Sequence, residues 1–313
     1  MRKMDLFFLS ILVTVFQASW SYYVSNSTLT WSRKSDECNT RVATPTIHYG
    51  HTDLIVDMNG QTTEQKVWVG YYQQTTLFEY IGCMSSEDLN ISKIQLGTSN
   101  IGRCYSACSN TPFIGIDRQM CYCMQVKPEK DMRKLGCISG CSDTHNAACG
   151  GNNFTSVYRI LPHNDSRQIP EKQEYSKSCL IVHINSEKNI TSVYGWRRCS
   201  VNIWVFCTSD SDQSVKVHEE KKSWRDAATM CFRKHGYPTG YKDVRNATYV
   251  GIYGWTGIVW SDVIYKDTDL EYSNNSSDIS YGYLEYDSSV GHVLNFSKED
   301  TRKYILCNGK GFY

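Results

Sequence analysis

Long apolar runs and an excess of charge of one sign are both missing from this sequence of 313 residues. The formal net charge is only +1, so no bulk electrostatic field draws the chain to nucleic acid or to an anionic membrane. Beyond the N-terminal segment, no stretch reaches the roughly 18 apolar residues of a membrane-spanning helix. The run EEKK at 219–222 is typical of a solvated face before a helix.

Sequence motifs of the common enzyme classes are also missing. There is no G-x-S-x-G, no H-E-x-x-H and no P-loop. His48 and His51 lie three apart, but no cysteine or acidic residue follows at the spacing of a zinc site. We therefore predict that the protein is not an enzyme. Folds bring distant carboxylates together, so a glycan-processing enzyme stays as a third alternative.

The N-terminus has the features of an export signal. Residues 1–21 combine Arg2 and Lys3 with the apolar run LFFLSILVTVF and the small residues of QASWS. This order predicts a secretory signal peptide and a secreted, extracellular protein. The sequence ends at CNGKGFY, shortly after a cysteine, so a fragment of a longer chain is one interpretation.

Cysteines and glycosylation sequons agree with export. Fourteen cysteines, an even number, predict disulfides rather than thiolate chemistry. Asn-x-Ser/Thr sequons predict N-linked glycans at surface positions. The sequons begin at Asn26, Asn90, Asn153, Asn164, Asn189, Asn246, Asn274, Asn275 and Asn295.

Two segments of the sequence resemble each other. TWSRKSDEC at 30–38 and SWRDAATMC at 223–231 both place a cysteine seven residues after a tryptophan, with a spacing that favours an amphipathic helix. A strand pattern follows each, VWVGYY at 67–72 and TYVGIYGW at 248–255. Segments 179–207 and 282–307 also match, because each opens on an apolar strand and closes on a strand ending in cysteine. The pattern predicts two copies of one fold.

This order of elements resembles the C-type lectin-like domain. The resemblance implies an α+β fold class, with two helices beside antiparallel sheets in each copy. It places the first domain in two pieces, 22–77 and 162–207, and the second at 215–313. A long disulfide would join the first helix to the last strand of each copy, and a short one would occur in the first copy only. The implied pairs are Cys38–Cys207, Cys231–Cys307 and Cys179–Cys199.

The segment between the two pieces resembles a different family. YIGC at 80–83, CYSAC at 104–108, CYC at 121–123, CISGC at 137–141 and CGG at 149–151 follow the order of a WSC domain, a small disulfide-rich module. The resemblance places this module at 78–161, inserted in a loop of the first copy, where a long insertion costs little closure entropy. Its implied disulfides are Cys83–Cys137, Cys104–Cys121, Cys108–Cys123 and Cys141–Cys149, which completes the use of all cysteines.

The motifs by which C-type lectins bind calcium are absent. Those lectins use a Glu-Pro-Asn or Gln-Pro-Asp loop and a Trp-Asn-Asp strand. Here the strand position holds YGW at 194–196 and LNF at 294–296, and none of the six prolines lies in the loop motif. The acidic residues Asp267, Asp269 and Glu271 lack the spacing of an EF-hand and are typical of a solvated loop. We expect no cofactor and no metal site.

Aromatic and amide side chains are the candidates for contact with a ligand, because planar rings stack on sugar faces and amides bond hydroxyls. Each has a structural alternative, since a ring between two cysteines can pack beneath disulfides. Trp260 and Phe113 are expected in the core. The predicted ligand-binding residues are Tyr105, Tyr122, Asn152, Tyr158 and Trp255.

These observations together predict a secreted protein that recognises glycans or glycoproteins without calcium. The WSC-like module is the expected glycan contact, and the family resemblance implies a role in host defence. The alternative is a structural or adhesive component of the extracellular matrix that uses its lectin-like domains for protein contacts. No nucleic-acid partner and no membrane span are expected, and the sequence leaves the oligomeric state open.

Overall fold

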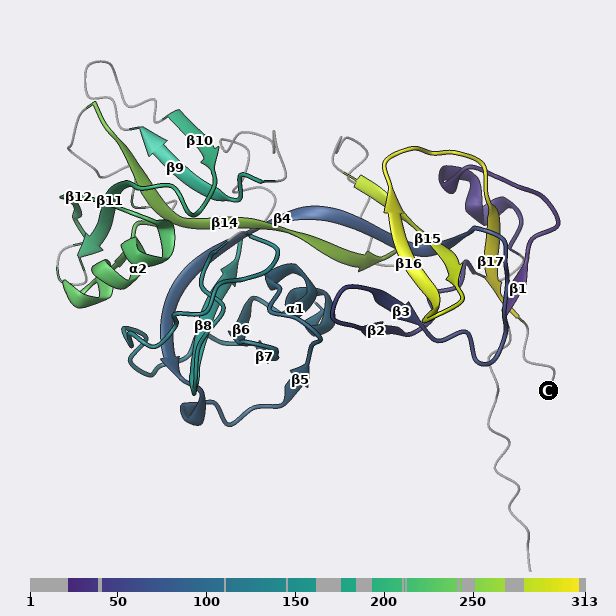
Figure 1. The fold of residues 1–313 in the computed structure, drawn as a ribbon, viewed down its shortest axis with the longest axis horizontal. Coiled ribbons are helices and arrows are strands. Elements are labelled where there is room, and N and C mark those ends of the chain that lie inside the picture. Colours follow the sequence, from purple (N-terminus) through teal and green to yellow (C-terminus); the bar gives the residue numbers. More distant parts are fainter. Residues whose placement is uncertain are drawn as a thin grey trace, which may run out of the picture.

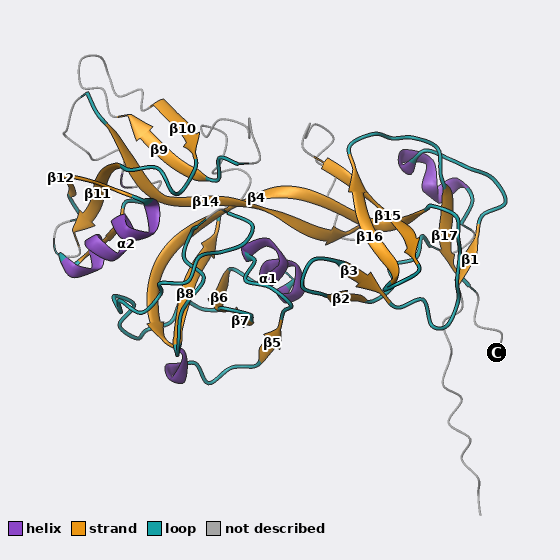
Figure 2. Ribbon diagram, in the orientation of Figure 1, coloured by secondary structure: helices purple, strands orange, loops and turns teal. Residues whose placement is uncertain are grey.

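The computed structural model is built mainly from β-strands. It describes residues 22–38, 41–109, 111–144, 146–161, 176–183, 193–209, 211, 213–240, 243, 251–267 and 279–309. This part of the chain contains seventeen strands, two α-helices of eight and ten residues, and two short 3₁₀ helices (Figure 2). The predicted signal peptide at 1–21 lies outside the described residues.

The expected α+β fold class is wrong, because the described residues form a β-rich fold. Residues 31–36, predicted as an amphipathic α-helix, form a 3₁₀ helix, and Thr30 at its start makes no side-chain capping bond. The matching segment of the second copy does form an α-helix, in which Ser223 Oγ accepts from the Asp226 amide as an N-cap. The described residues of the two copies thus hold one α-helix, where two per copy were expected.

Two long strands cross the molecule. β4 (Val67–Ser85) and β14 (Tyr253–Lys266) pair antiparallel over nine consecutive residue pairs, 71–79 with 258–266, a section called the ribbon below. At about 3.3 Å per residue, the nineteen residues of β4 extend for about 60 Å, about twice the width of a small domain. Figure 1 shows the ribbon joining units that lie at opposite sides of the molecule.

One end of the ribbon enters the terminal unit, made from 22–72 and 279–309. Here β4 lies between an antiparallel neighbour, β15, and a parallel neighbour, β17. β15 continues through β16 and β3 to β2, and β1 pairs with β17. The elements are β1 (Tyr22–Val24), the 3₁₀ helix η1 (Trp31–Asp36), β2 (Ile47–Tyr49), β3 (Leu54–Val56), β15 (Ile279–Asp287), β16 (Gly291–Ser297) and β17 (Tyr304–Asn308).

The other end of the ribbon enters the internal unit, made from the described residues of 176–260. Here β14 lies between an antiparallel neighbour, β9, and a parallel neighbour, β11. β9 pairs with β10, and β11 pairs with β12 and β13. The elements are β9 (Cys179–His183), β10 (Val193–Arg197), β11 (Ile203–Ser209), β12 (Val215–Lys222), α2 (Trp224–Arg233) and β13 (Gly236–Pro238).

The two units repeat one set of contacts. In each unit, the tryptophan of the helical segment donates its indole N–H to a backbone carbonyl of the long strand. The tryptophan of the long strand donates its indole N–H to the carbonyl of the residue that lies two positions before the tryptophan of the helical segment. The four hydrogen bonds are Trp31 to Val69 O at 3.1 Å, Trp224 to Thr256 O at 2.7 Å, Trp68 to Leu29 O at 3.0 Å and Trp255 to Lys222 O at 2.8 Å. The repeat seen in the sequence is therefore a repeat of packing as well.

The second halves of the two copies are exchanged, which corrects the expected domains. The helical segment and long strand of the first copy pack on 279–309, and those of the second copy pack on 179–207. The expected pairs Cys38–Cys207 and Cys231–Cys307 are accordingly not formed. The structure instead contains the disulfides Cys38–Cys307 and Cys207–Cys231.

The physical reason lies in the length of the long strands. β4 and β14 continue beyond the unit in which each begins, so the ribbon carries each chain segment across the molecule. The chain that follows β14 then forms β15 and β17, which pair with β4 and complete the terminal unit. In the sequence alone, either second half fits either first half, because both close on a strand that ends in cysteine.

Residues 78–161 form the cysteine module beside the ribbon. The second half of β4 pairs with β8, which places Phe78 opposite Ile160, so the chain enters and leaves the module at neighbouring positions. The four disulfides expected here are present, as is Cys179–Cys199 in the internal unit. The further elements are the 3₁₀ helix η2 (Ser86–Asp88), β5 (Lys93–Gln95), α1 (Ile101–Cys108), β6 (Phe113–Asp117), β7 (Met120–Met124) and β8 (Phe154–Ile160).

Helix α1 fixes the module to both of its neighbours. The Asp143 carboxylate accepts from the Ile101 amide at 2.9 Å and from the Ser261 hydroxyl of β14, which joins the helix start to the ribbon. Arg103 donates to the carbonyls of Gly50 and Thr52, both at 2.9 Å, which joins the helix to the loop between β2 and β3. The module is thereby held against the ribbon and the terminal unit at once.

Disulfide mapping tests the exchange. Digestion at acidic pH without reductant should release peptides joined through Cys38–Cys307 and Cys207–Cys231, because protonated thiols do not reshuffle disulfides. Mass spectrometry of the digest identifies the joined peptides. Peptides joined through Cys38 and Cys207 would contradict the exchanged arrangement, and the Cys83–Cys137 pair is an internal control that both arrangements share.

The buried anchor at Asp143 should make stability depend on pH. Burial raises the pKa of Asp143 above its ordinary value of 3.8, although hydrogen bonds from Ser261 and the α1 backbone lower it. The folded-state pKa is therefore above the unfolded one. The contribution of Asp143 is fully present below the unfolded pKa and is lost as pH rises through the folded pKa.

The variant Asp143→Asn lacks this titration. Relative to wild type, its free energy of unfolding in urea should improve as the pH rises from about 4 to about 8. Urea curves of both proteins, with the disulfides intact, measure the difference. A difference that stays constant over this pH range would exclude Asp143 as the titrating group.

Candidate functional site

A cavity of about 250 Å³ lies where the module, the ribbon and the terminal unit meet. We call it the central tyrosine pocket, because four tyrosines line it: Tyr49 of β2, Tyr71 of β4, Tyr105 of α1 and Tyr265 of β14. Hydroxyl-bearing side chains from the same segments complete the polar lining: Thr44, Thr46, Ser106 and Ser109. In Figure 1 these elements converge where α1 approaches the ribbon and β2.

Ring contacts hold the tyrosines of the pocket in place. Tyr265 stacks on Tyr72 with the ring centroids 5.3 Å apart, and it meets the edge of Tyr105 at 6.3 Å. Tyr105 also packs edge-to-face on Phe78 at 5.8 Å. Such arrangements suit the quadrupoles of the rings and restrict their rotation. The ring of Tyr105 is therefore held rigidly although it is only half-buried.

Several hydroxyls of the pocket are fixed by hydrogen bonds. The Tyr71 hydroxyl donates to the Pro45 carbonyl at 2.7 Å, and the hydroxyls of Tyr265 and Thr76 share a bond of 2.7 Å. Ser106 Oγ accepts from the Ile264 amide at 2.8 Å, which joins α1 to β14. These bonds fix the orientation of the polar atoms in the lining.

The pocket is nearly uncharged. Lys266 is its one charged lining residue among those described, and no lining residue is a carboxylate. Burial raises the pKa of Tyr49 to about 12, and the positive charge of Arg103 only partly opposes this. Burial also raises the pKa of Tyr71 and of Tyr105. Tyr49, Tyr71 and Tyr105 are thus neutral at physiological pH. A neutral phenol carries one donor and an acceptor, and the donor of Tyr71 is already used by the Pro45 carbonyl.

Two of the five predicted ligand-binding residues lie where a ligand can reach them. Tyr105 lines the central tyrosine pocket. Asn152 lies exposed on the module, and its amide oxygen accepts from the Arg118 guanidinium. The structure does not bring these two residues together, since Asn152 is not part of the pocket lining.

The other three predicted residues are buried, so they do not contact a ligand. The Tyr158 side chain is fully buried, and its hydroxyl donates to the Ala148 carbonyl at 2.5 Å. Trp255 makes the repeat contact with Lys222. Tyr122 is buried on β7, with its hydroxyl near Ser86. The structural alternative considered for these rings is therefore the correct one. Trp260 is buried in the core as expected, whereas Phe113 is only partly buried and packs against a core cluster.

The described sequons lie at the surface. Asn26, Asn90 and Asn153 are exposed, and Asn295 is partly exposed on β16. Asp267, from the acidic stretch, forms an ion pair of 3.3 Å with Lys34. The remaining predicted positions lie outside the described residues: Asn164, Asn189, Asn246, Asp269, Glu271, Asn274 and Asn275.

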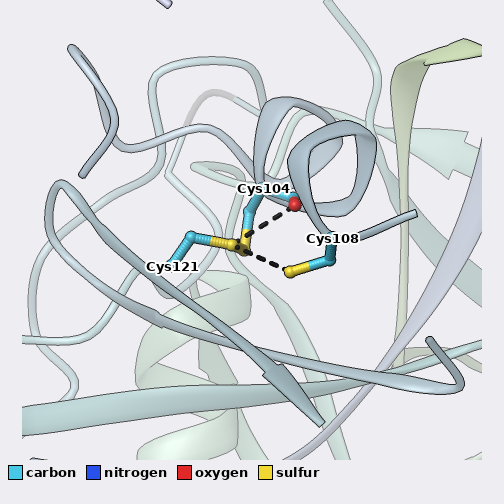
Figure 3. Close-up of side chains that lie close together, drawn as sticks. All are labelled: Cys104, Cys108 and Cys121. Atoms are coloured by element: carbon cyan, nitrogen blue, oxygen red, sulfur yellow. Dashed lines mark hydrogen bonds between the residues drawn. A yellow bond between two sulfur atoms is a disulfide. The ribbon is translucent and has the colours of Figure 1, made fainter. Parts of the chain in front are cut away.

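Three cysteine sulfurs of the module lie within 4.8 Å of one another, at Cys104, Cys108 and Cys121 (Figure 3). All three are in disulfides, Cys104 with Cys121 and Cys108 with Cys123. A disulfide sulfur is not a thiolate, which is the form of cysteine that binds metal. The cluster forms because the two disulfides lie next to each other, with Cys108 Sγ 3.4 Å from Cys121 Sγ.

Sequence reasoning missed three of the four pocket tyrosines. Tyr49, Tyr71 and Tyr265 come from β2, β4 and β14, and no local motif marks any of them. Their meeting depends on the exchanged pairing, which brings β14 of the second copy onto β4 of the first. A sequence pattern within one segment cannot indicate a pocket whose residues come from several distant segments.

Comparisons with models of protein families, with curated proteins and with solved structures found no match to this chain. None of the helices among the described residues is long and apolar enough to cross a membrane. The seven disulfides leave no free cysteine and are typical of extracellular proteins.

The buried position of Tyr158 can be tested by stability. Tyr158→Phe removes the hydroxyl that satisfies the Ala148 carbonyl and should lower the free energy of unfolding by about 1–2 kcal/mol. Urea unfolding measures the change. The control Tyr286→Phe alters an exposed tyrosine and should leave stability unchanged. An equal effect of the two variants would argue against a structural hydroxyl at Tyr158.

Proposed function

We propose that the protein is an extracellular recognition protein that binds glycans in the central tyrosine pocket without calcium. The observation that carries the proposal is the composition of this cavity: four tyrosine rings and four aliphatic hydroxyls around about 250 Å³, with no carboxylate in the described lining. Disulfide-rich chains of this kind function in oxidising environments, where glycans are abundant ligands.

The chemistry of the lining suits a sugar. A sugar ring has an apolar face of C–H groups and a rim of hydroxyls, so it needs a flat aromatic surface beside donors and acceptors. Tyr105 offers such a surface from α1, and Ser106 and Ser109 follow it on the same segment. The neutral hydroxyls of the lining supply hydrogen-bonding atoms without the desolvation cost of a charge.

The size of the cavity limits the ligand. Pockets for drug-sized molecules have volumes of about 300–1,000 Å³. A cavity of about 250 Å³ is below that range, so it accommodates one or two sugar rings. The proposed ligand is therefore the end of a glycan chain, whose remaining residues extend into solvent.

Calcium has no evident role at this pocket. Calcium takes six to eight oxygen ligands, usually with several carboxylates among them. The described lining offers hydroxyls and one lysine, which repels a cation. Recognition by stacking and neutral hydrogen bonds is the mechanism that remains.

The module contributes to recognition in this proposal by presenting Tyr105 to the pocket. Its WSC-like nature remains a prediction, and so does the role in host defence. An adhesive function is the second candidate, and one observation favours it: the apolar side chains of Val126 and Ile138 are 75% and 67% exposed on the module. Exposed apolar side chains of this kind are suited to contact with another protein.

A glycan array tests the proposal with the full-length chain. Wild type should bind neutral glycans equally with and without EDTA. Tyr105→Ala removes the half-buried ring that lines the pocket and should weaken that binding about tenfold, whereas Tyr105→Phe keeps the ring and most of the affinity. Tyr286→Ala, an exposed tyrosine outside the pocket, is the matched control.

The outcomes separate the alternatives. Loss of binding in EDTA would show a calcium site and refute the proposed mechanism. Capture of matrix proteins with no glycan bound would favour the adhesive function. Circular dichroism and urea unfolding of each variant establish that Tyr105→Ala remains folded.

A further inference from the structure

A second cavity, of about 510 Å³, lies in the terminal unit and is open to solvent along one side. β15 contributes Tyr283, the segment before β4 contributes Lys66, and the segment between β16 and β17 contributes Glu299, Arg302 and Lys303. We call it the basic pocket, since three cations face one carboxylate in its described lining. It shares no lining residue with the central tyrosine pocket.

The Lys303 ammonium lies over two aromatic rings. Its Nζ lies 3.8 Å from the ring centroid of Trp68 and 4.8 Å from that of Tyr283, and it donates to Thr301 Oγ1 at 2.6 Å. No carboxylate of the described residues forms a salt bridge with it. Burial lowers the pKa of Lys303, and so does the charge of Lys66, while Glu299 and Asp300 act in the opposite direction.

A second ammonium faces the same tyrosine. Lys66 Nζ lies 5.8 Å from the ring centroid of Tyr283 and 2.8 Å from Glu285 Oε1, and its side chain is 53% exposed. An exposed ion pair is worth little, so Lys66 exchanges its partner at small cost. Arg302 is also exposed and can turn its guanidinium toward the opening.

Three acids lie near the basic pocket, and one of them is in its described lining. Asp300 accepts from the Trp31 amide and, at 2.9 Å, from the Ser32 hydroxyl, which directs it toward η1. Glu285 faces Lys66 from the rim. Glu299 is the one carboxylate in the described lining. The excess of positive charge is therefore local, since the whole chain carries only +1.

We propose that the basic pocket binds the oxyanion of an acidic glycan, a carboxylate or a sulfate attached to a sugar ring. Lys66, Arg302 and Lys303 supply the cations, and charge-assisted bonds to such oxyanions are the stronger kind of hydrogen bond. Tyr283, whose ring centroid lies 5.8 Å and 4.8 Å from the two ammonium groups, supplies aromatic surface beside them. The open side admits a chain that extends beyond the bound residue. The inference adds a second site to the proposed glycan recognition and stands independently of the central tyrosine pocket.

One sequon bears directly on the design of the test. Asn295 lies opposite Tyr283 in the β15–β16 pairing, so the two side chains share a face of the sheet. A glycan on Asn295 would lie beside the pocket and compete with a ligand. The variants are therefore made both in the wild-type chain and in an Asn295→Gln background.

Isothermal titration of the full chain measures binding of sialyllactose, lactose, a heparin tetrasaccharide and its desulfated form. At least one anionic probe should bind about tenfold more tightly than its neutral or desulfated counterpart, with an affinity that falls as salt is added. Preference for sialyllactose over lactose identifies a carboxylate ligand, and preference for the sulfated tetrasaccharide identifies a sulfate ester.

The double variant Lys66→Gln/Arg302→Gln changes exposed side chains and should weaken anionic binding about tenfold while the protein remains folded. Lys93→Gln/Lys130→Gln removes two exposed cations of the module and should have no effect. Equal affinity for anionic and neutral probes, or an equal loss in the two double variants, would overturn the proposal. Tyr105→Ala should leave this binding intact, so failure at one site is distinguishable from failure at the other.

Discussion

The antiparallel pairing of β4 with β14 is the interaction on which the rest of the structure depends. Nine consecutive residue pairs join a strand of the first copy to a strand of the second. Neither strand ends inside the unit where it begins, so each carries the chain to a different set of partners. The same pairing places Tyr72 against Tyr265 and provides the surface on which α1 of the module rests. The central tyrosine pocket is a consequence of that contact.

The exchange also decides how the disulfides stabilise the molecule. Cys38–Cys307 joins residues 269 apart, whereas Cys207–Cys231 closes a separation of only 24. On the chain-entropy account, the first stabilises the fold by about 5–6 kcal/mol and the second by about 3 kcal/mol. The longer bridge closes the terminal unit, which is assembled from the two ends of the described chain. Bringing these two distant segments together costs more conformational entropy than closing the other units, and this is the unit that contains the longest disulfide loop.

Reasoning from the sequence succeeded where contacts are local. The four module disulfides, which the resemblance to a WSC domain implied, are present and span separations of 54 residues or fewer. The capped helix at 224–233 and the strand beginning at Val67 were also predictable, because an N-cap and an apolar run act within a few residues. Such reasoning failed for Tyr158 and Trp255, whose rings look the same in a sequence whether they face solvent or core.

The sequence by itself determined the repeat and the even set of cysteines, because both are patterns of residue type along the chain. The tertiary structure decided which second half closes which first half, and hence the partners of Cys38 and Cys231. It also decided the β-rich character of the fold and the meeting of four tyrosines from distant strands. The physical reason is that two similar copies present equivalent surfaces to either partner. Only the length and direction of the ribbon distinguish the two arrangements.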